Sequence, residues 1–292
     1  MRFLVTMLVF PALVGAQTAT EHYKAGRAAM GANNAEMAIR TFEKAVALDD
    51  KNAEYHLWLG RAVGSRAIVA SKFQQPFLAR RAKGEFERAV QLDPTSVGAR
   101  EGLLQFYLNA PGVMGGSLEK ARQQAAEIGK VSRLRGHLAS ANIANREKDQ
   151  ATAEREYRGA ISDAPDSSVA SVALANFLQS SGRSDEAFAT IDRALARHPA
   201  DPALLFGVGR LAAASGRQLD RGEHALRQLL AIGPADTAAT GLPAPAVIHF
   251  RLGELLVKKG QKTQAVKEFE VALELNPRLD AARKALLATS LM

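Results

Sequence analysis

Three features of this sequence have residue types and spacing that could support chemistry: its six histidines, a glycine-containing hexapeptide and a glycine-rich loop. Histidine binds zinc and acts as a general acid or base near neutral pH. The hexapeptide Gly207–Ala212 (GVGRLA) resembles part of a dinucleotide-binding fingerprint, and Asn109–Ser117 (NAPGVMGGS) places two glycines before a predicted helix, where an anion can bind. Whether any of these forms a site depends on the elements that hold it.

Missing residue types and motifs exclude several kinds of catalytic and metal site. The sequence has no cysteine, which excludes disulfides, thiolate zinc sites, iron–sulfur clusters and cysteine nucleophiles. No Gly-Lys-Ser/Thr follows the glycine loop, so it is not a P-loop. The sequence also contains no nucleophilic serine elbow, paired-histidine zinc motif or calcium loop. We therefore expect a protein that is not an enzyme and that uses no cofactor or metal.

The first 16 residues have the pattern of a secretory signal peptide. Arg2 precedes an apolar stretch from Phe3 to Val14, and small residues follow up to Ala16. A membrane anchor is the alternative, but a spanning helix needs about 20 apolar residues. We expect cleavage after Ala16, with cleavage after Ala19 as a minor variant. The sequence thus predicts a periplasmic or secreted protein without a transmembrane segment.

The rest of the chain repeats one pattern. A small residue is followed twelve positions later by alanine, then by a bulky apolar residue, a second alanine and a proline, as in Gly253, Ala265, Phe269, Ala272 and Pro277. Small residues allow two helices to approach to about 8–10 Å, and proline ends a helix because it cannot continue the hydrogen-bond ladder. The pattern predicts antiparallel helix pairs that stack on each other, since one pair cannot bury its own apolar face.

At these residues the chain resembles the tetratricopeptide repeat (TPR) family, whose 34-residue unit consists of two helices, A and B. The resemblance implies an all-α, right-handed α-solenoid with a C-terminal capping helix over residues 280–292. The seven predicted repeats span residues 19–52, 53–96, 97–133, 134–167, 168–201, 202–236 and 246–279.

The repeat alignment argues against the candidate chemistries. Four histidines share one repeat position, which indicates packing, and neighbouring repeats lie too far apart for them to share one zinc ion. These are His22, His56, His137 and His249. Gly207–Ala212 falls inside a predicted helix with no strand before it, so it lacks the context of a dinucleotide site.

The resemblance also implies that the A helices line a concave groove for a protein or peptide partner. Two positions four residues apart share one helix face. The first is mostly apolar and comprises Tyr23, Leu57, Glu101, Leu138, Val172, Phe206 and Phe250; the second is polar and comprises Arg27, Arg61, Gln105, Asn142, Asn176, Arg210 and Glu254. An alternative assigns Leu138 and Val172 to the core. These two residues also replace the lysines with which one TPR subgroup binds a C-terminal carboxylate, so we do not expect that activity.

Two insertions distinguish repeats two and three. Twenty-two residues separate Gly60 from Ala82 where twelve are expected, which predicts a longer hairpin with an apolar tip. Repeat three has five extra residues in Asn109–Ser117, with Ser117 as the predicted cap of the next helix. Both insertions lie at A–B turns and should share one edge. A third addition, Thr237–Pro245, should lie at the opposite edge.

The positive charge is concentrated beside these insertions. The chain has a formal net charge of +8, and residues 61–135 contain thirteen Lys/Arg against six Asp/Glu. A solvated face is one explanation; an anionic surface, either lipid headgroups or polysaccharide, is the other. This basic edge comprises Arg66, Lys72, Phe73, Phe77, Arg80, Arg81 and Lys83. The leading hypothesis is a non-catalytic scaffold that binds a protein or peptide, with docking on an anionic surface as the alternative; the modest charge density does not indicate nucleic acid.

Overall fold

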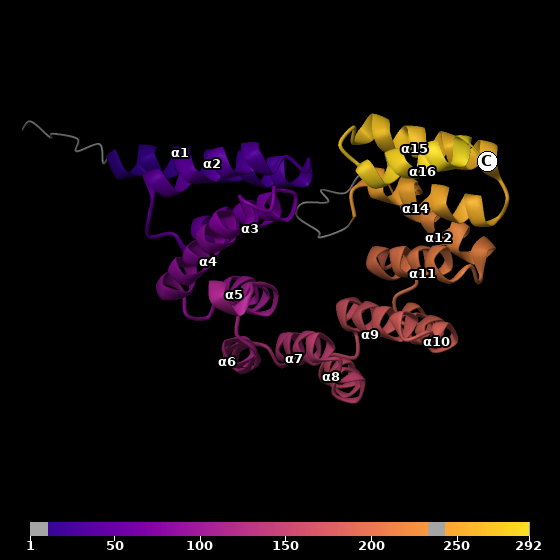
Figure 1. Cartoon of the computed structure of the whole chain (residues 1–292), viewed down its shortest axis with the longest axis horizontal. Helices are drawn as coiled ribbons and strands as arrows, with labels where there is room; N and C mark the ends of the chain where they lie inside the picture. The colour runs from indigo at the N-terminus through magenta and orange to yellow at the C-terminus, as the bar shows by residue number, and fades with distance from the viewer. Residues whose placement is uncertain (1–10, 233–242, 292) are drawn as a thin grey trace, which may run out of the picture. The chain divides into compact units, whose positions relative to one another are not determined.

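The computed structural model describes residues 11–232 and 243–291, which form α-helices and one 3-10 turn without a strand in these ranges (Figure 1). Contacts divide the chain into two compact units, which meet between Val131 and Ser132 in the sequence. Unit 1 contains α1 (Pro11–Gly31), α2 (Ala35–Leu48), α3 (Ala53–Ile68), α4 (Gln75–Leu92), α5 (Val97–Asn109), η1 (Gly112–Met114) and α6 (Leu118–Val131).

Unit 2 contains the remaining helices. They are α7 (Arg133–Glu147), α8 (Gln150–Asp163), α9 (Ser168–Ser180), α10 (Ser184–Leu195), α11 (Pro202–Ser215), α12 (Leu219–Ala231), α14 (Pro245–Lys258), α15 (Lys262–Leu275) and α16 (Asp280–Ser290). No helix in the described residues is long and apolar enough to cross a membrane.

Consecutive helices pack in antiparallel pairs, as the repeat pattern predicts. In unit 1 the pairs are α1 with α2, α3 with α4 and α5 with α6, and in unit 2 they run from α7 with α8 to α14 with α15. Within each unit the first helix of a pair also contacts the first helix of the next pair, and α16 packs on α15 and α14. The predicted all-α solenoid fold is confirmed.

Small side chains permit the close approach of helices both within a pair and between neighbouring pairs. A Cβ atom added at Gly60 of α3 would lie 2.7 Å from the ring of Phe86 in α4, and one at Gly102 of α5 would lie 2.6 Å from the same ring. Phe86 is buried between these two glycines. The glycine–aromatic contact recurs at Gly253 and Phe269 in unit 2. The periodic small residues are therefore contact points between helices.

Short polar residues set the start of most helices. Their side chains accept hydrogen bonds from backbone N–H groups that have no partner within the helix. The residues that cap helices in this way are Asn34, Asn52, Ser96, Ser117, Ser132, Asp149, Ser167 and Asp201. The predicted cap at Ser117 is confirmed, since its Oγ accepts the N–H of Lys120 at 3.2 Å.

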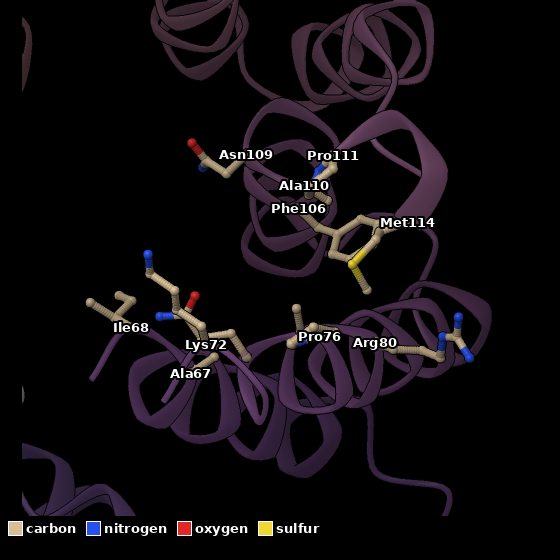
Figure 2. A pocket seen from close by; sticks show the side chains of 12 residues that line it. Ala67, Ile68, Lys72, Pro76, Arg80, Phe106, Asn109, Ala110, Pro111 and Met114 are labelled. Carbon is tan, nitrogen blue, oxygen red and sulfur yellow. The ribbon is translucent and has the colours of Figure 1, made fainter. Parts of the chain in front are cut away.

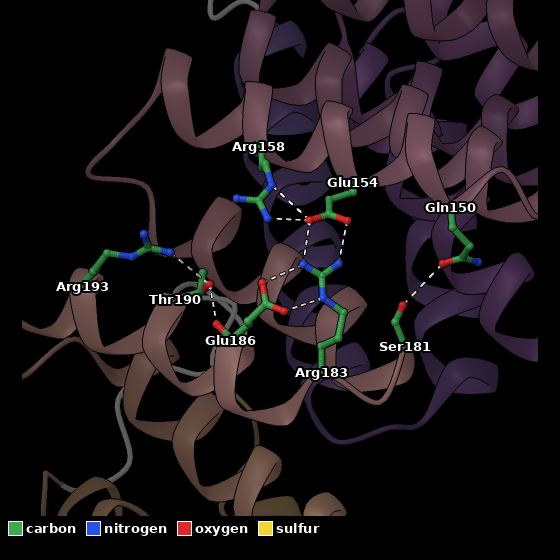
Figure 3. A network of polar contacts seen from close by, with 8 residues as sticks. All are labelled: Gln150, Glu154, Arg158, Ser181, Arg183, Glu186, Thr190 and Arg193. Carbon is green, nitrogen blue, oxygen red and sulfur yellow. Dashed lines mark hydrogen bonds and ion pairs between the residues drawn. The ribbon is translucent and has the colours of Figure 1, made fainter.

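Ion pairs join the B helices of neighbouring repeats. At the start of α10, Arg183 donates from Nη1 to Glu154 of α8 at 2.7 Å and from Nε to Glu186 at 2.6 Å (Figure 3). Hydrogen bonds from Arg183 and then from Arg158 lower the pKa of Glu154 to about 2. Lys259, which directly follows α14, binds Glu223 of α12 at 2.6 Å and so links the α14–α15 repeat to the one before it. These contacts fix one repeat against the next on the B-helix side.

The two predicted insertions lie side by side in unit 1. Residues of the α3–α4 hairpin and of the α5–η1 segment line the same cavity, so the prediction that they share an edge is confirmed. The third addition falls largely within residues 233–242, outside the described residues.

Candidate functional site

Three of the four equivalent histidines connect the two helices of their own repeat. His56 Nδ1 lies 2.7 Å from Glu85 Oε2, His137 Nδ1 lies 2.8 Å from Glu156 Oε2, and His249 Nδ1 lies 2.6 Å from Glu268 Oε2. The hydrogen bond from His56 to Glu85 raises the pKa of His56. These three histidines are therefore structural, as the shared repeat position indicates.

The glutamate partners were missed in the sequence. Glu85, Glu156 and Glu268 occupy one position in helix B, so the alignment that grouped the histidines could also have found them. Among the described residues, no three His, Asp or Glu side chains gather as metal ligands. Gly207–Ala212 lies inside α11, and Gly209 makes room there for Leu226, which accounts for its small size without a nucleotide.

In unit 1, the predicted groove residues form a cluster that is closed on itself. The Arg27 guanidinium lies 3.8 Å from the centre of the Trp58 ring, and that of Arg61 lies 4.6 Å from it. Trp58 Nε1 donates to Glu54 Oε1 at 2.7 Å, Tyr23 donates to the same atom at 3.1 Å, and Arg27 donates to the Tyr23 hydroxyl at 3.0 Å. These cation–π and hydrogen-bond contacts hold Arg27, Arg61 and Trp58 against one another.

Burial and neighbouring charge affect the remaining unit 1 groove positions differently. Burial lowers the pKa of Arg61, and the nearby carboxylates of Glu101 and Glu54 partly oppose this. Leu57 is only 5% exposed, which leaves little of it for a ligand. Gln105 is exposed and accepts a hydrogen bond from Asn109 at 3.2 Å.

In unit 2, Oε1 of Gln179 in α9 is one buried polar atom without a partner, and three more such atoms lie on successive A helices. They are Oδ1 of Asn176 in α9, Nη2 of Arg210 in α11 and Nε of Arg251 in α14. Helix α11 packs against both α9 and α14. Burial lowers the pKa of Arg210, and the like charge of Arg251 lowers it further.

Other contacts orient this cluster, which we call the Asn–Arg face (Asn176, Arg210 and Arg251). Arg251 donates to Glu254 Oε2 at 2.7 Å, and its guanidinium lies 5.1 Å from the centre of the Phe250 ring. Arg210 has no ion pair among the described residues. The alignment did not select Arg251 because it lies one residue beyond the position taken from the family; its charge beside Phe250 was the available signal.

The apolar row of unit 2 belongs largely to the core. Phe250 is 8% exposed, while Leu138, Val172 and Phe206 are partly buried and pack on the main cluster. This supports the alternative that assigns Leu138 and Val172 to the core. Asn142 lies half-buried in α7. The accessible chemistry of this face therefore comes mainly from its polar row.

The basic edge has fewer free charges than the sequence suggests. Arg66 pairs with Glu36 at 3.4 Å, Lys83 pairs with Glu87 at 2.5 Å, and Arg81 pairs with Glu43. Lys72 and Arg80 have no ion pair in the part of the chain that the structure describes. Both line a cavity of about 520 Å³ between the two insertions (Figure 2).

Comparisons with known proteins agree with this architecture. Three models described as "Tetratricopeptide repeat" match residues 23–63, 144–211 and 246–279. The chain is thus a member of the tetratricopeptide repeat family, whose fold is typical of protein-interaction scaffolds and whose members are generally non-catalytic. No curated protein matches the sequence.

Solved structures with the same fold are distant in sequence. Yeast Tom70 matches with a TM-score of 0.64 and 14% identity, over 99% of this chain and 58% of that chain. A tetratricopeptide repeat protein from Parabacteroides merdae matches with a TM-score of 0.53 and 14% identity, over 94% and 99%. A monomeric IFIT1 mutant with Gppp-AAAA matches with a TM-score of 0.59 and 16% identity, over 96% and 62%. The chain thus spans only part of Tom70 and IFIT1, and these likenesses establish the fold alone.

Proposed function

We propose that this protein is a non-catalytic adaptor of the bacterial envelope that binds an extended peptide segment of a partner protein on the Asn–Arg face of unit 2. The observation that carries the proposal is the set of partnerless buried atoms on three successive A helices. A buried polar atom without a partner costs about 1–3 kcal/mol. A ligand that supplies the missing partners recovers part of that cost.

The missing partners include both hydrogen-bond donors and acceptors, and this favours a peptide as the ligand. Arg210 and Arg251 need hydrogen-bond acceptors, whereas Asn176 Oδ1 needs a donor. An extended peptide backbone offers both, because carbonyl and N–H groups alternate along it. A phosphate group offers acceptors only. The uncompensated charge of Arg210 favours a segment with an acidic side chain or a terminal carboxylate.

The envelope location rests on the N-terminal sequence. Residues 1–16 combine a basic start, an apolar stretch and small residues at a cleavage position, the features of an export signal. The lack of cysteine is compatible with an oxidising compartment.

Selection from a phage-displayed library of random twelve-residue peptides tests the proposal, with the immobilised full chain as target. We expect recovered peptides to be enriched in acidic residues. Their dissociation constants, measured by fluorescence anisotropy, should rise at least about tenfold in Arg210→Ala and in Asn176→Ala, because each variant removes one hydrogen-bonding group.

A matched variant controls for non-specific charge effects. Arg278 is exposed and lies outside the Asn–Arg face, so Arg278→Ala should bind like the unmodified chain. Circular dichroism should show the same helical content in all variants. Equal affinity of Arg210→Ala and the unmodified chain, or no recovered peptide, would contradict the proposal.

A further inference from the structure

In the described residues, most of the large apolar side chains that are more than 75% exposed belong to the two insertions of unit 1; Leu291, after α16, is the exception. At the α3–α4 turn, Ile68 is 80%, Val69 76%, Phe73 89% and Phe77 77% exposed, and Val113 of η1 is 98% exposed. Large apolar side chains in such a group mark an interaction surface more often than isolated ones do. We call these five residues the apolar tip.

Acidic residues are absent from the sequence around the apolar tip. Residues 55–84 contain no Asp or Glu, and residues 102–118 contain no charged residue at all. The exposed cations of this region that lack an ion pair in the described structure are Lys72 and Arg80, which lie towards opposite ends of the groove between the insertions (Figure 2). The surface is therefore apolar with a positive rim.

The groove itself is lined mainly by apolar groups. Pro76 and Ile68 from the hairpin face Phe106 and Met114 from the α5–η1 segment, around a space of about 520 Å³ (Figure 2). Val69, Phe73, Phe77 and Val113 do not line it. A single helix or peptide in the groove would leave these four side chains in water.

We propose that the apolar tip and the groove beside it form a docking surface for a bilayer that contains anionic lipids. A membrane interface surrounds an inserted tip, so it covers the apolar residues both inside and outside the groove. Apolar side chains enter such an interface by about 5–10 Å while nearby cations contact the headgroups. Lys72 and Arg80 are placed for that role, and the groove can take an acyl chain.

Co-sedimentation of the full chain with vesicles tests this docking. We expect binding to phosphatidylcholine vesicles with 30% phosphatidylglycerol and weak binding to phosphatidylcholine alone. Phe73→Ser/Phe77→Ser should lower the partition coefficient at least about tenfold, because it removes the inserted side chains. Lys72→Gln/Arg80→Gln should lower it about tenfold at low salt and little at high salt. All four changes are at exposed or rim positions, so folding should persist.

Matched controls separate the tip from other surfaces. Lys267→Gln/Lys284→Gln removes two exposed lysines of unit 2, and Leu287→Ser/Leu291→Ser removes two exposed leucines there. Both controls should bind vesicles like the unmodified chain. Every chain keeps the same N-terminus, so its apolar stretch contributes equally to each measurement.

A second readout follows the tip directly. In Phe73→Trp, the fluorescence of the new tryptophan, taken as the difference from the unmodified chain with Trp58, should shift to shorter wavelength on anionic vesicles. An unshifted spectrum, or equal vesicle binding by the unmodified chain and Phe73→Ser/Phe77→Ser, would overturn the proposal. The proposal would also be overturned if Phe73→Ser/Phe77→Ser lost its binding to a protein partner but kept its binding to vesicles. Peptide binding by the Asn–Arg face is independent of either result.

Discussion

At the scale of single residues, the polar side chains of this protein divide into those with partners and those without. In unit 1, the guanidinium groups of Arg27 and Arg61 both lie over the ring of Trp58, which in turn donates a hydrogen bond to Glu54. In unit 2, Arg210 occupies the same repeat position as these arginines but, among the described residues, has neither a cation–π contact nor an ion pair. Arginines at equivalent repeat positions therefore differ in how free they are to contact a ligand.

The His56–Glu85 pair gives a prediction for pH. The folded state raises the pKa of His56, so this pair contributes its full stability below the unfolded value near 6.5 and loses it as the pH rises through the folded pKa. The difference in unfolding free energy between the unmodified chain and His56→Gln should be larger at pH 6 than at pH 9, by about 1 kcal/mol. Urea unfolding followed by Trp58 fluorescence measures it.

The exposed His224 provides the control for this pair. At pH 6 and at pH 9, His224→Gln should have nearly the same free energy of unfolding as the unmodified chain. A His56→Gln difference that does not change between pH 6 and pH 9 would show that the charged pair contributes no stability.

At the scale of the helices, α3 contains one glycine that packs against the neighbouring helix and one that does not. Gly60 faces Phe86 of α4, where an added Cβ would lie 2.7 Å from the ring, whereas a Cβ at Gly64 would meet nothing within 4 Å. Both glycines lie inside the same 16-residue helix. The repeat pattern identifies Gly60 as the contact point because it recurs in phase with Gly26 and Gly253.

Substitution of these two glycines should have opposite effects. Gly60→Ala should lower the free energy of unfolding by about 1–3 kcal/mol, because the Phe86 ring must move in a packed interface. Gly64→Ala should raise it by up to about 1 kcal/mol, because alanine favours the helix. Urea unfolding followed by Trp58 fluorescence reports on both, since Trp58 lies in α3. Equal stability of the two variants would contradict the assigned packing.

At the scale of the whole molecule, the excess positive charge belongs to one part of the chain. The formal net charge is +8, with the excess concentrated in residues 61–135. Ion pairs offset part of this positive charge, because Arg66, Arg81 and Lys83 are paired with glutamates. The two free cations beside the apolar tip, rather than the total charge, therefore set the expected electrostatic attraction to a membrane.

Export predicts a defined processed form. If residues 1–16 are a signal peptide, the chain exported from a bacterial host should begin at Gln17, which intact-protein mass spectrometry can measure. Ala16→Asp should block cleavage because the peptidase needs a small residue there, whereas Thr18→Ala should be processed normally. Retention of residues 1–16 in the exported protein would contradict the signal-peptide interpretation.

The sequence by itself determined the helix pairs, their small contact residues and the shared edge of the two insertions. These features follow from local periodicity and turn chemistry, which a single chain displays in its residue order. Only the tertiary structure decided which contacts the polar groups make: Arg27 and Arg61 stack on Trp58 in unit 1, whereas Arg210 in unit 2 has no such ring and no ion pair among the described residues. The reason is that contacts such as the one between Arg27 and Trp58 join successive repeats, so they depend on the packing of one helix pair on the next.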